Sequence, residues 1–195
     1  MSKVVIVVDT QADFMLPDGA LAVAGADALA QPMADWLGAL DPADTAAVLF
    51  TFDTHHRDTY PFSEEAKQFP IHCVRGEPGW RNMLSPDAVA SGIPIFRLEK
   101  GVFAMWEEPG LSVEPIDPAG AARDRDAFFA DLRATGVVEA EVIGVAADYC
   151  VKWAVDGLVA RGFNVTIPAA LTAGIARPIA QVVAEDFAAQ PVRVA

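Results

Sequence analysis

The feature that most constrains the fold is an unbroken apolar run near the start of the chain, Lys3–Asp9 (KVVIVVD). Val and Ile are β-branched and favour strands. Because no polar residue alternates with them, the pattern indicates a strand buried on both faces. Thr45–Asp53 (TAAVLFTFD) repeats this pattern. Strands of this kind are typical of a parallel sheet that helices cover on both sides.

The rest of the chain alternates between strand-like and helix-like patterns. Four further segments read as strands, with Pro94 confining the first to a strand start or an irregular position: Ile93–Glu99, Glu141–Ala146, Asn164–Pro168 and Pro191–Val194. Four segments have helical periodicity: Leu29–Leu40, Asp126–Thr135, Val151–Arg161 and Pro178–Gln190. We therefore expect one α/β domain over residues 1–195, a three-layer sandwich whose mostly parallel central sheet has about six strands.

Charge and composition exclude several classes of partner. The formal net charge of −13 over 195 residues argues against a nucleic acid or an anionic membrane. No apolar run approaches the roughly 20 residues of a membrane span, and the start of the chain lacks a signal-peptide pattern. We expect a cytoplasmic protein whose two cysteines, Cys73 and Cys150, are free thiols.

Two long segments do not fit the alternation, Thr54–Asn82 and Glu107–Gly120. Both follow strand ends, where α/β proteins place their binding sites. We expect loops in both places. Residues 107–120 could line the site or form a subunit contact in a homo-oligomer, and the residues alone do not decide between these.

Three polar residues stand at or next to the carboxyl ends of three predicted strands: Asp9, Lys100 and Cys150. In a parallel sheet these ends share one edge, so the three side chains can converge. Cys150 also begins a predicted helix, whose amino terminus favours a thiolate. A nucleophilic thiol needs a proton acceptor and a positive neighbour, which Asp9 and Lys100 could supply. The alternatives are a turn-capping Asp9, a solvated Lys100 and an inert buried Cys150.

A second group of polar residues predicts a metal site. Asp53 ends the second strand, His55 follows it closely, and Glu64, Glu65 and His72 lie further along the same loop. Imidazole and carboxylate ligands suit zinc, manganese or iron. His56 should point away from His55 in extended backbone, and we interpret Cys73 as a packing residue. The alternative is a polar loop with hydrogen-bonded histidines.

Together these segments resemble the isochorismatase-like cysteine hydrolases, and among them the nicotinamidases. The likeness spans nearly the whole chain, and five segments carry it in order: Asp9–Phe14 (DTQADF), Asp18–Val23 (DGALAV), Asp53–His55 with Phe69–Cys73 (DTH, FPIHC), Lys100–Phe103 (KGVF) and Gly144–Val151 (GVAADYCV).

The resemblance implies a role for each site residue. Cys150 is the nucleophile, Asp9 the general base, and Lys100 supports the thiolate and the developing charge. The metal ligands are Asp53, His55 and His72. Many nicotinamidases have another loop histidine where Thr59–Phe62 has none, so we expect Glu65 as the fourth ligand, with Glu64 as the alternative.

The resemblance also implies an oxyanion hole and an aromatic pocket. A cis peptide at Val145–Ala146 would aim the Ala146 N–H at the oxyanion, together with that of Cys150. The residues expected to wall the substrate ring are Phe14, Phe69, Phe103 and Trp106.

The function that these expectations define is a metal-containing cysteine amidohydrolase of linear amides. Nicotinamide would be hydrolysed to nicotinate and ammonia through a Cys150 thioester, pyrazinamide would also be a substrate, and the reaction would serve NAD salvage in pyridine nucleotide metabolism. We expect zinc as the metal, with manganese or iron as alternatives. A carbamoyl or ureido acid is the alternative substrate, and a non-catalytic binding protein is the alternative of another class.

Overall fold

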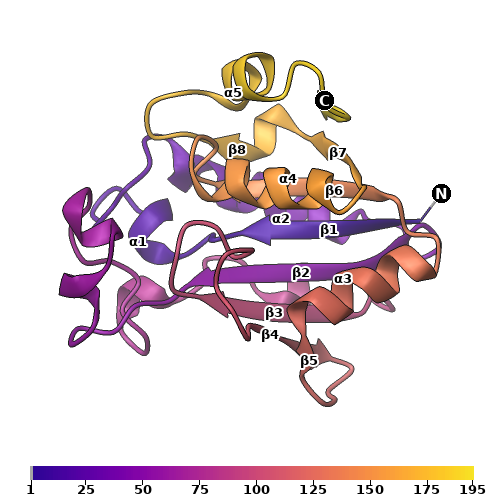
Figure 1. Cartoon of the computed structure of the whole chain (residues 1–195), viewed down its shortest axis with the longest axis horizontal. Coiled ribbons are helices and arrows are strands. Elements are labelled where there is room, and N and C mark those ends of the chain that lie inside the picture. The colour runs from indigo at the N-terminus through magenta and orange to yellow at the C-terminus, as the bar shows by residue number, and fades with distance from the viewer. Residues whose placement is uncertain (1) are drawn as a thin grey trace.

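The computed structural model describes residues 2–195, and within them nine strands form one sheet in the order β5-β4-β3-β2-β1-β6-β7-β9, with β8 beside β6 (Figure 1). The strands are β1 (Lys3–Val8), β2 (Thr45–Asp53), β3 (Ile95–Lys100), β4 (Ser112–Asp117), β5 (Arg123–Asp124), β6 (Glu139–Val145), β7 (Asn164–Ile167), β8 (Thr172–Ala173) and β9 (Val192–Val194). The α-helices are α1 (Ala12–Met15), α2 (Ala30–Gly38), α3 (Arg125–Ala134), α4 (Cys150–Ala160) and α5 (Ile179–Asp186).

The central strand β1 explains why the molecule has three layers. Its side chains alternate between two separate hydrophobic cores: Val4 and Ile6 face the core that includes α3 and α4, whereas Val5 and Val7 face the core that includes α1 and α2. Each fully buried Val or Ile side chain contributes roughly 1.5–3 kcal/mol. Both faces of the strand are therefore covered, as the unbroken apolar run predicts (Figure 1).

The α/β fold class is confirmed, and the number of strands is larger than predicted. All six expected strands are present, but β4, β5 and β8 bring the described sheet to nine. β4 lies inside the 107–120 segment that we expected to be a loop, and it pairs antiparallel with β3. Pro115 concealed this strand. It is tolerated there because β5 pairs only with Ser112 and Val113, which leaves the Pro115 part of β4 at the sheet edge.

The carboxyl ends of the parallel strands meet at one edge of the sheet. Asp53 and Lys100, the last residues of β2 and β3, are register partners. Asp9 follows β1, which ends one residue earlier than expected, and has a φ of 47°. The Val145–Ala146 peptide after β6 is cis. The helical elements of the segment 54–82 are short 3-10 turns, among them η2 (Tyr60–Phe62) and η3 (Glu65–Lys67), and a single β-bridge joins His55 to Val74.

Among residues 2–195, no helix has both the length and the apolar character needed to cross a membrane.

Candidate active site

The structure brings together the three polar residues predicted at strand ends. Lys100 Nζ lies 2.8 Å from Asp9 Oδ2 and 3.6 Å from Cys150 Sγ. All three side chains are buried. A carboxylate, an ammonium group and a thiol therefore share one enclosed space, which is the arrangement that a cysteine nucleophile with a general base requires.

Asp9 is fixed from two sides. The Thr51 hydroxyl, from the middle of β2, donates to Asp9 Oδ1 at 2.6 Å, while Lys100 holds Oδ2. Thr51 itself is buried. The sequence analysis did not single it out, although a hydroxyl inside an otherwise apolar strand is a signal of such a contact, because a buried polar group needs a partner.

The charges around the thiol favour its protonated form at rest. Burial raises the pKa of the Cys150 thiol well above its ordinary value; Lys100 lowers it in part, and Asp9 and Asp53 raise it further. Burial alone would lower the pKa of Lys100, but Asp53 and Asp9 hold it well above the ordinary range. Lys100, expected to support the thiolate, lies 3.6 Å from the sulfur and is the neighbour that lowers the pKa of the thiol.

The turn between β6 and α4 supplies backbone amides close to the sulfur. The Ala146 carbonyl accepts the N–H groups of Tyr149 and Val151, at 3.0 and 3.1 Å, which closes the turn. Cys150 is the first residue of α4. Its N–H is therefore one of the amides that a helix leaves without an intrahelical acceptor, and such an amide can donate to a developing negative charge.

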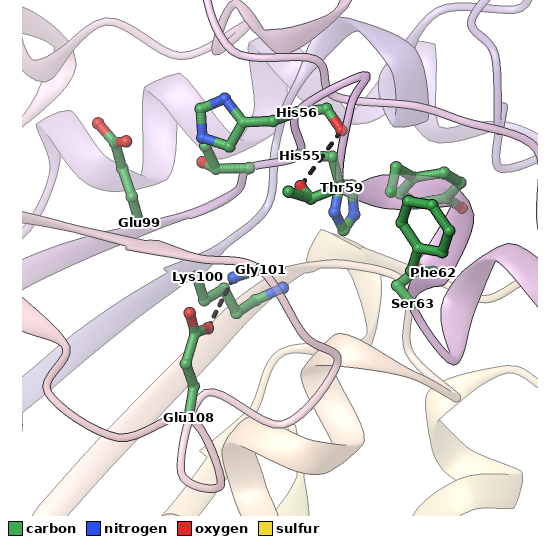
Figure 2. Close-up of a pocket in the computed structure, with 11 residues that line it drawn as sticks. His55, His56, Thr59, Phe62, Ser63, Glu99, Lys100, Gly101 and Glu108 are labelled. Atoms are coloured by element: carbon green, nitrogen blue, oxygen red, sulfur yellow. Dashed lines mark hydrogen bonds between the residues drawn. The ribbon is translucent and has the colours of Figure 1, made fainter.

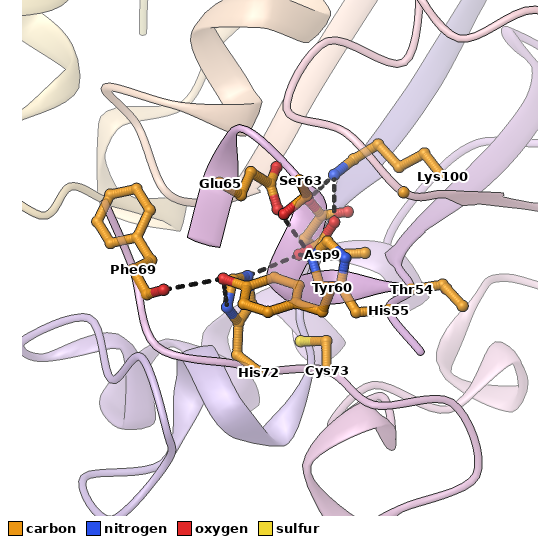
Figure 3. Close-up of polar contacts among 12 residues, drawn as sticks. Asp9, Thr54, His55, Tyr60, Ser63, Glu65, Phe69, His72, Cys73 and Lys100 are labelled. Atoms are coloured by element: carbon orange, nitrogen blue, oxygen red, sulfur yellow. Dashed lines mark hydrogen bonds and ion pairs between the residues drawn. The ribbon is translucent and has the colours of Figure 1, made fainter. Parts of the chain in front are cut away.

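Four donor side chains from β2 and the loop after it converge beside this centre, and Figure 3 shows the three from the loop, His55, Glu65 and His72. Asp53, His55, Glu65 and His72 are all buried, and one ligand atom from each lies within 4.8 Å of the others. Asp53 Oδ2 is 3.0 Å from His55 Nε2 and 2.9 Å from His72 Nε2, and Glu65 Oε2 is 2.8 Å from His55 Nε2.

The hydrogen bonds of this group fit a divalent cation. His72 Nδ1 lies 2.8 Å from the Pro70 carbonyl, which can only accept, so Nδ1 donates and the Nε2 lone pair points toward Asp53. Glu65 Oε1 has no hydrogen-bond partner among the described residues, and the contact of Oε2 is with the same His55 Nε2 that Asp53 Oδ2 approaches, at 2.8 and 3.0 Å. A buried carboxylate without a donor is costly unless a cation is present. We conclude that these residues can hold a divalent metal.

The same charges act on His55. Burial would lower the pKa of its imidazole, but its contacts with Asp53 and Glu65 outweigh burial and raise the pKa to about 9. Without a metal, a protonated His55 would balance the two carboxylates.

The structure separates the two candidate glutamates. Glu64 points outward and binds Lys67 at 2.6 Å, with its side chain 83% exposed. Glu65 is buried in the donor group. His56 is exposed, in agreement with the prediction that it points away from His55. Cys73 is buried, and burial raises the pKa of its thiol far above the ordinary value, consistent with a packing residue.

Two residues that the sequence analysis missed hold the donor group in place. The Gln11 side chain clamps the backbone of Asp53, accepting its N–H at 2.7 Å and donating to its carbonyl at 2.8 Å. The Tyr60 hydroxyl donates to the Pro70 carbonyl at 2.9 Å, and its ring packs edge-on against His55 at 4.7 Å.

A narrow inner cavity joins the thiol to the donor group. Its lining side chains leave about 280 Å³ of space between them, part of which opens to solvent. Its polar lining comes from Cys150, Asp53 and His72, and its other lining residues are Phe14, Leu21, Phe69, Phe103, Ala146, Tyr149 and Ile175. Three of the four predicted wall residues therefore line it.

The prediction that Trp106 walls the substrate ring is wrong. The structure places Trp106 against α4 and outside the lining of this cavity. Its Nε1 donates to the Trp153 carbonyl at 3.0 Å, and its ring packs on Phe129 at 4.9 Å. The nearby Phe103 turns toward the cavity, while Trp106 turns toward the core. Tyr149 and Ile175 take part in the wall instead.

A larger outer pocket, with about 930 Å³ of space that also opens to solvent, reaches the donor group from outside (Figure 2). Its lining includes the buried side chains of His55 and Lys100, with Phe62 and Glu108 at its walls. The donor group therefore lies between two cavities, with His55 on the outer one and Asp53 and His72 on the inner one.

The comparisons with known proteins agree with this geometry. No family model matches the chain. The curated nicotinamidase/pyrazinamidase of Mycobacterium tuberculosis is 32% identical over 176 residues, which are 89% of this chain and 87% of that protein. The crystal structure of the pyrazinamidase of Pyrococcus horikoshii in complex with zinc has a TM-score of 0.73 at 24% identity, covering 100% of this chain and 99% of that one.

A third similar protein is named for a different amide. The N-carbamoylsarcosine amidase of Thermoplasma acidophilum has a TM-score of 0.72 at 20% identity, covering 100% of this chain and 95% of that one. The fold is thus shared by amidases of different substrates, and the choice among substrates depends on the site.

Proposed function

The chain belongs to the nicotinamidase/pyrazinamidase family of isochorismatase-like hydrolases, and on that premise we propose that it hydrolyses nicotinamide to nicotinate and ammonia through a Cys150 thioester. Pyrazinamide, whose ring has the same shape, would be a second substrate.

The observation that carries this proposal is the lining of the inner cavity. Cys150 and the donor residues Asp53 and His72 face one small space that is otherwise apolar and largely aromatic. A pyridine carboxamide is flat, has a ring nitrogen that can bind a metal, and has an amide carbon that a thiol can attack. Its two functional groups match the two polar parts of the cavity.

The proposed reaction uses the three residues at the strand ends. Cys150 gives its proton to Asp9 and attacks the amide carbon, so a carbon–sulfur bond forms and the carbonyl oxygen becomes negative. The N–H groups of Ala146 and Cys150 donate to that oxygen, a contribution of about 3–4 kcal/mol per donor in comparable sites. Asp9 then protonates the amide nitrogen, the carbon–nitrogen bond breaks and ammonia leaves. Asp9 next takes a proton from the water that attacks the thioester, the carbon–sulfur bond breaks to release nicotinate, and that proton returns to the Cys150 sulfur. Lys100 balances the charge of Asp9 throughout.

Asp53, His55, Glu65 and His72 would hold the metal, for which we propose zinc because two imidazoles and two carboxylates suit it. Manganese and iron are the alternatives. When bound, the metal supplies a Lewis acid for the ring nitrogen and so fixes the ring for attack. A carbamoyl or ureido acid has no such nitrogen, and for that reason the donor group favours nicotinamide over those substrates.

We also propose that residues 1–195 form one domain and that the enzyme serves NAD salvage in the cytoplasm. A single sheet built from both ends of the chain supports the first statement. The proposed product, nicotinate, supports the assignment to NAD salvage.

The test is the release of ammonia and nicotinate from nicotinamide by the purified, zinc-loaded protein. We expect turnover at an ordinary enzymatic rate, about 1–10³ s⁻¹, and none in Cys150→Ala. Removal of the metal by a chelator should lower turnover, and added zinc should restore it. If the zinc-loaded protein releases no ammonia from nicotinamide, the proposed substrate is wrong.

A further inference from the structure

We propose that Ile175 is a specificity-determining residue of the inner cavity and that Asp148 is the positioning residue that holds it there. The inference rests on the proposed function for the choice of substrates. Neither residue belongs to the catalytic or metal-binding groups described above.

Asp148 binds the backbone of a distant segment. Its carboxylate is nine-tenths buried and accepts three successive N–H groups, from Ile175 at 2.9 Å, Ala176 at 2.8 Å and Arg177 at 2.9 Å. Successive backbone amides that converge on one anion make a strong, well-defined contact. The segment 174–177 is therefore folded around this one carboxylate.

The segment is also closed at both ends. A Cβ on Gly174 would lie 2.0 Å from the Arg177 carbonyl oxygen, so only glycine fits this bend. The Arg177 side chain donates to Glu185 at 2.9 Å and to Asp186 at 3.0 Å, which ties the segment to α5. Ile175 is thus carried by a constrained stretch of backbone.

Ile175 differs from the other walls of the cavity. The rings of Phe69, Phe103 and Tyr149 contact one another, with centroids 5.3–5.8 Å apart. Ile175 is aliphatic and 41% exposed, so it separates the cavity from solvent. Trimming this side chain would enlarge the cavity outward without disturbing the aromatic cluster.

Asp148 also links this wall to the nucleophile. It lies two residues before Cys150 in the turn that precedes α4, so the sulfur and Ile175 are held by the same turn. A substituent on the substrate ring that reaches Ile175 would displace the amide from the sulfur. We infer that Ile175 rejects ring-substituted amides at this side of the cavity.

The first test compares nicotinamide with its four ring-methylated isomers, carrying the methyl at positions 2, 4, 5 or 6. In Ile175→Ala, kcat/KM for at least one isomer relative to nicotinamide should rise roughly tenfold, because one methylene in an apolar pocket changes discrimination by about 10-fold or more. Val102→Ala is the matched control, since Val102 is a similarly exposed aliphatic residue outside the cavity lining. Unchanged ratios for all four isomers in Ile175→Ala would overturn the proposal.

The second test examines Asp148. Asp148→Asn replaces one acceptor oxygen by an NH₂ group, so it should loosen the segment and raise KM for nicotinamide several-fold more than it lowers kcat. Its effect on the methyl-isomer ratios should overlap with that of Ile175→Ala, so the double variant should fall short of the product of the two single effects. If the double variant shows the full product of the two single effects on these ratios, Asp148 does not position Ile175.

A labelling experiment separates this inference from the proposed substrate. The rates at which iodoacetamide and the bulkier iodoacetanilide alkylate Cys150 can be followed by peptide mass spectrometry. Ile175→Ala should raise the relative rate of the bulkier reagent several-fold, and Val102→Ala should not. If wild type fails to hydrolyse nicotinamide but this ratio rises, the proposed function falls and the role of Ile175 stands. If nicotinamide is hydrolysed and the ratio does not change, the role of Ile175 falls.

Discussion

The carboxylate of Asp53 is shared between two groups with different tasks. Its Oδ1 lies 3.1 Å from Lys100 Nζ, and its Oδ2 lies within 3.0 Å of His55 and His72. Lys100 also binds Asp9 at 2.8 Å. Asp9, Lys100 and the four donor residues therefore form one continuous chain of charged and hydrogen-bonding groups. Gln11 holds Asp53, the central member of this chain, by its backbone.

At this scale the contact between Thr51 and Asp9 gives a direct prediction. Thr51→Val keeps the shape of the side chain and a residue that suits a strand, but Asp9 loses its 2.6 Å donor. Because a hydrogen bond to a charged group contributes about 1.5–3 kcal/mol, kcat for nicotinamide should fall about 10- to 100-fold with KM little changed. Thr51→Ser should restore most of the rate. A valine variant that works within twofold of wild type would show that Asp9 does not depend on this contact.

Among the elements, α4 carries both Cys150, the proposed nucleophile, and the packing that holds it. The helix begins at Cys150, and farther along it Gly157 is covered by the indole of Trp106. The Trp106 N–H donates to the Trp153 carbonyl of the same helix. The glycine therefore provides the space in which the loop after β3 packs on α4.

Gly157→Ala should consequently destabilise the protein, although alanine is the better helix former by about 1 kcal/mol. A Cβ there would lie 2.1 Å from Trp106 Nε1, and overpacking typically costs 1–3 kcal/mol on top of the lost hydrogen bond. We expect a net loss of about 1–2 kcal/mol in the free energy of unfolding, measured by urea denaturation. Gly38→Ala is the control, because its Cβ would meet only the Ala88 carbonyl, at 3.4 Å. A Gly157→Ala protein as stable as wild type would contradict this account of the packing.

Over the whole molecule, the sequence predicted the features that depend on local residue patterns. Unbroken apolar runs identified the buried strands, and their shared edge brought Asp9, Lys100 and Cys150 together. The four donor residues lie at the end of β2 and in the loop that follows it, so their proximity could be predicted from the sequence. The burial of Glu65 and the exposure of Glu64 agree with the choice of Glu65 as the expected fourth member of the donor group.

What the sequence could not supply depends on contacts between distant segments. Ile175 reaches the cavity because β8 pairs with β6 and Asp148 binds the next segment, neither of which has a periodic signal. β4 was hidden by its proline and its polar residues. Trp106 and Phe103 lie in one short loop, and only the packing on α4 decides which of them faces the core.

If Cys150 attacks the amide and carries the acyl group, the acyl-enzyme can be detected by the mass of the protein during turnover. Zinc-loaded enzyme mixed with excess nicotinamide, quenched in acid within milliseconds and digested, should contain a nicotinoyl group on the peptide with Cys150 and none on the peptide with Cys73. Hydroxylamine, which cleaves thioesters, should remove it. Turnover of nicotinamide by a Cys150→Ala protein, or an acyl group found on any other residue, would contradict the account.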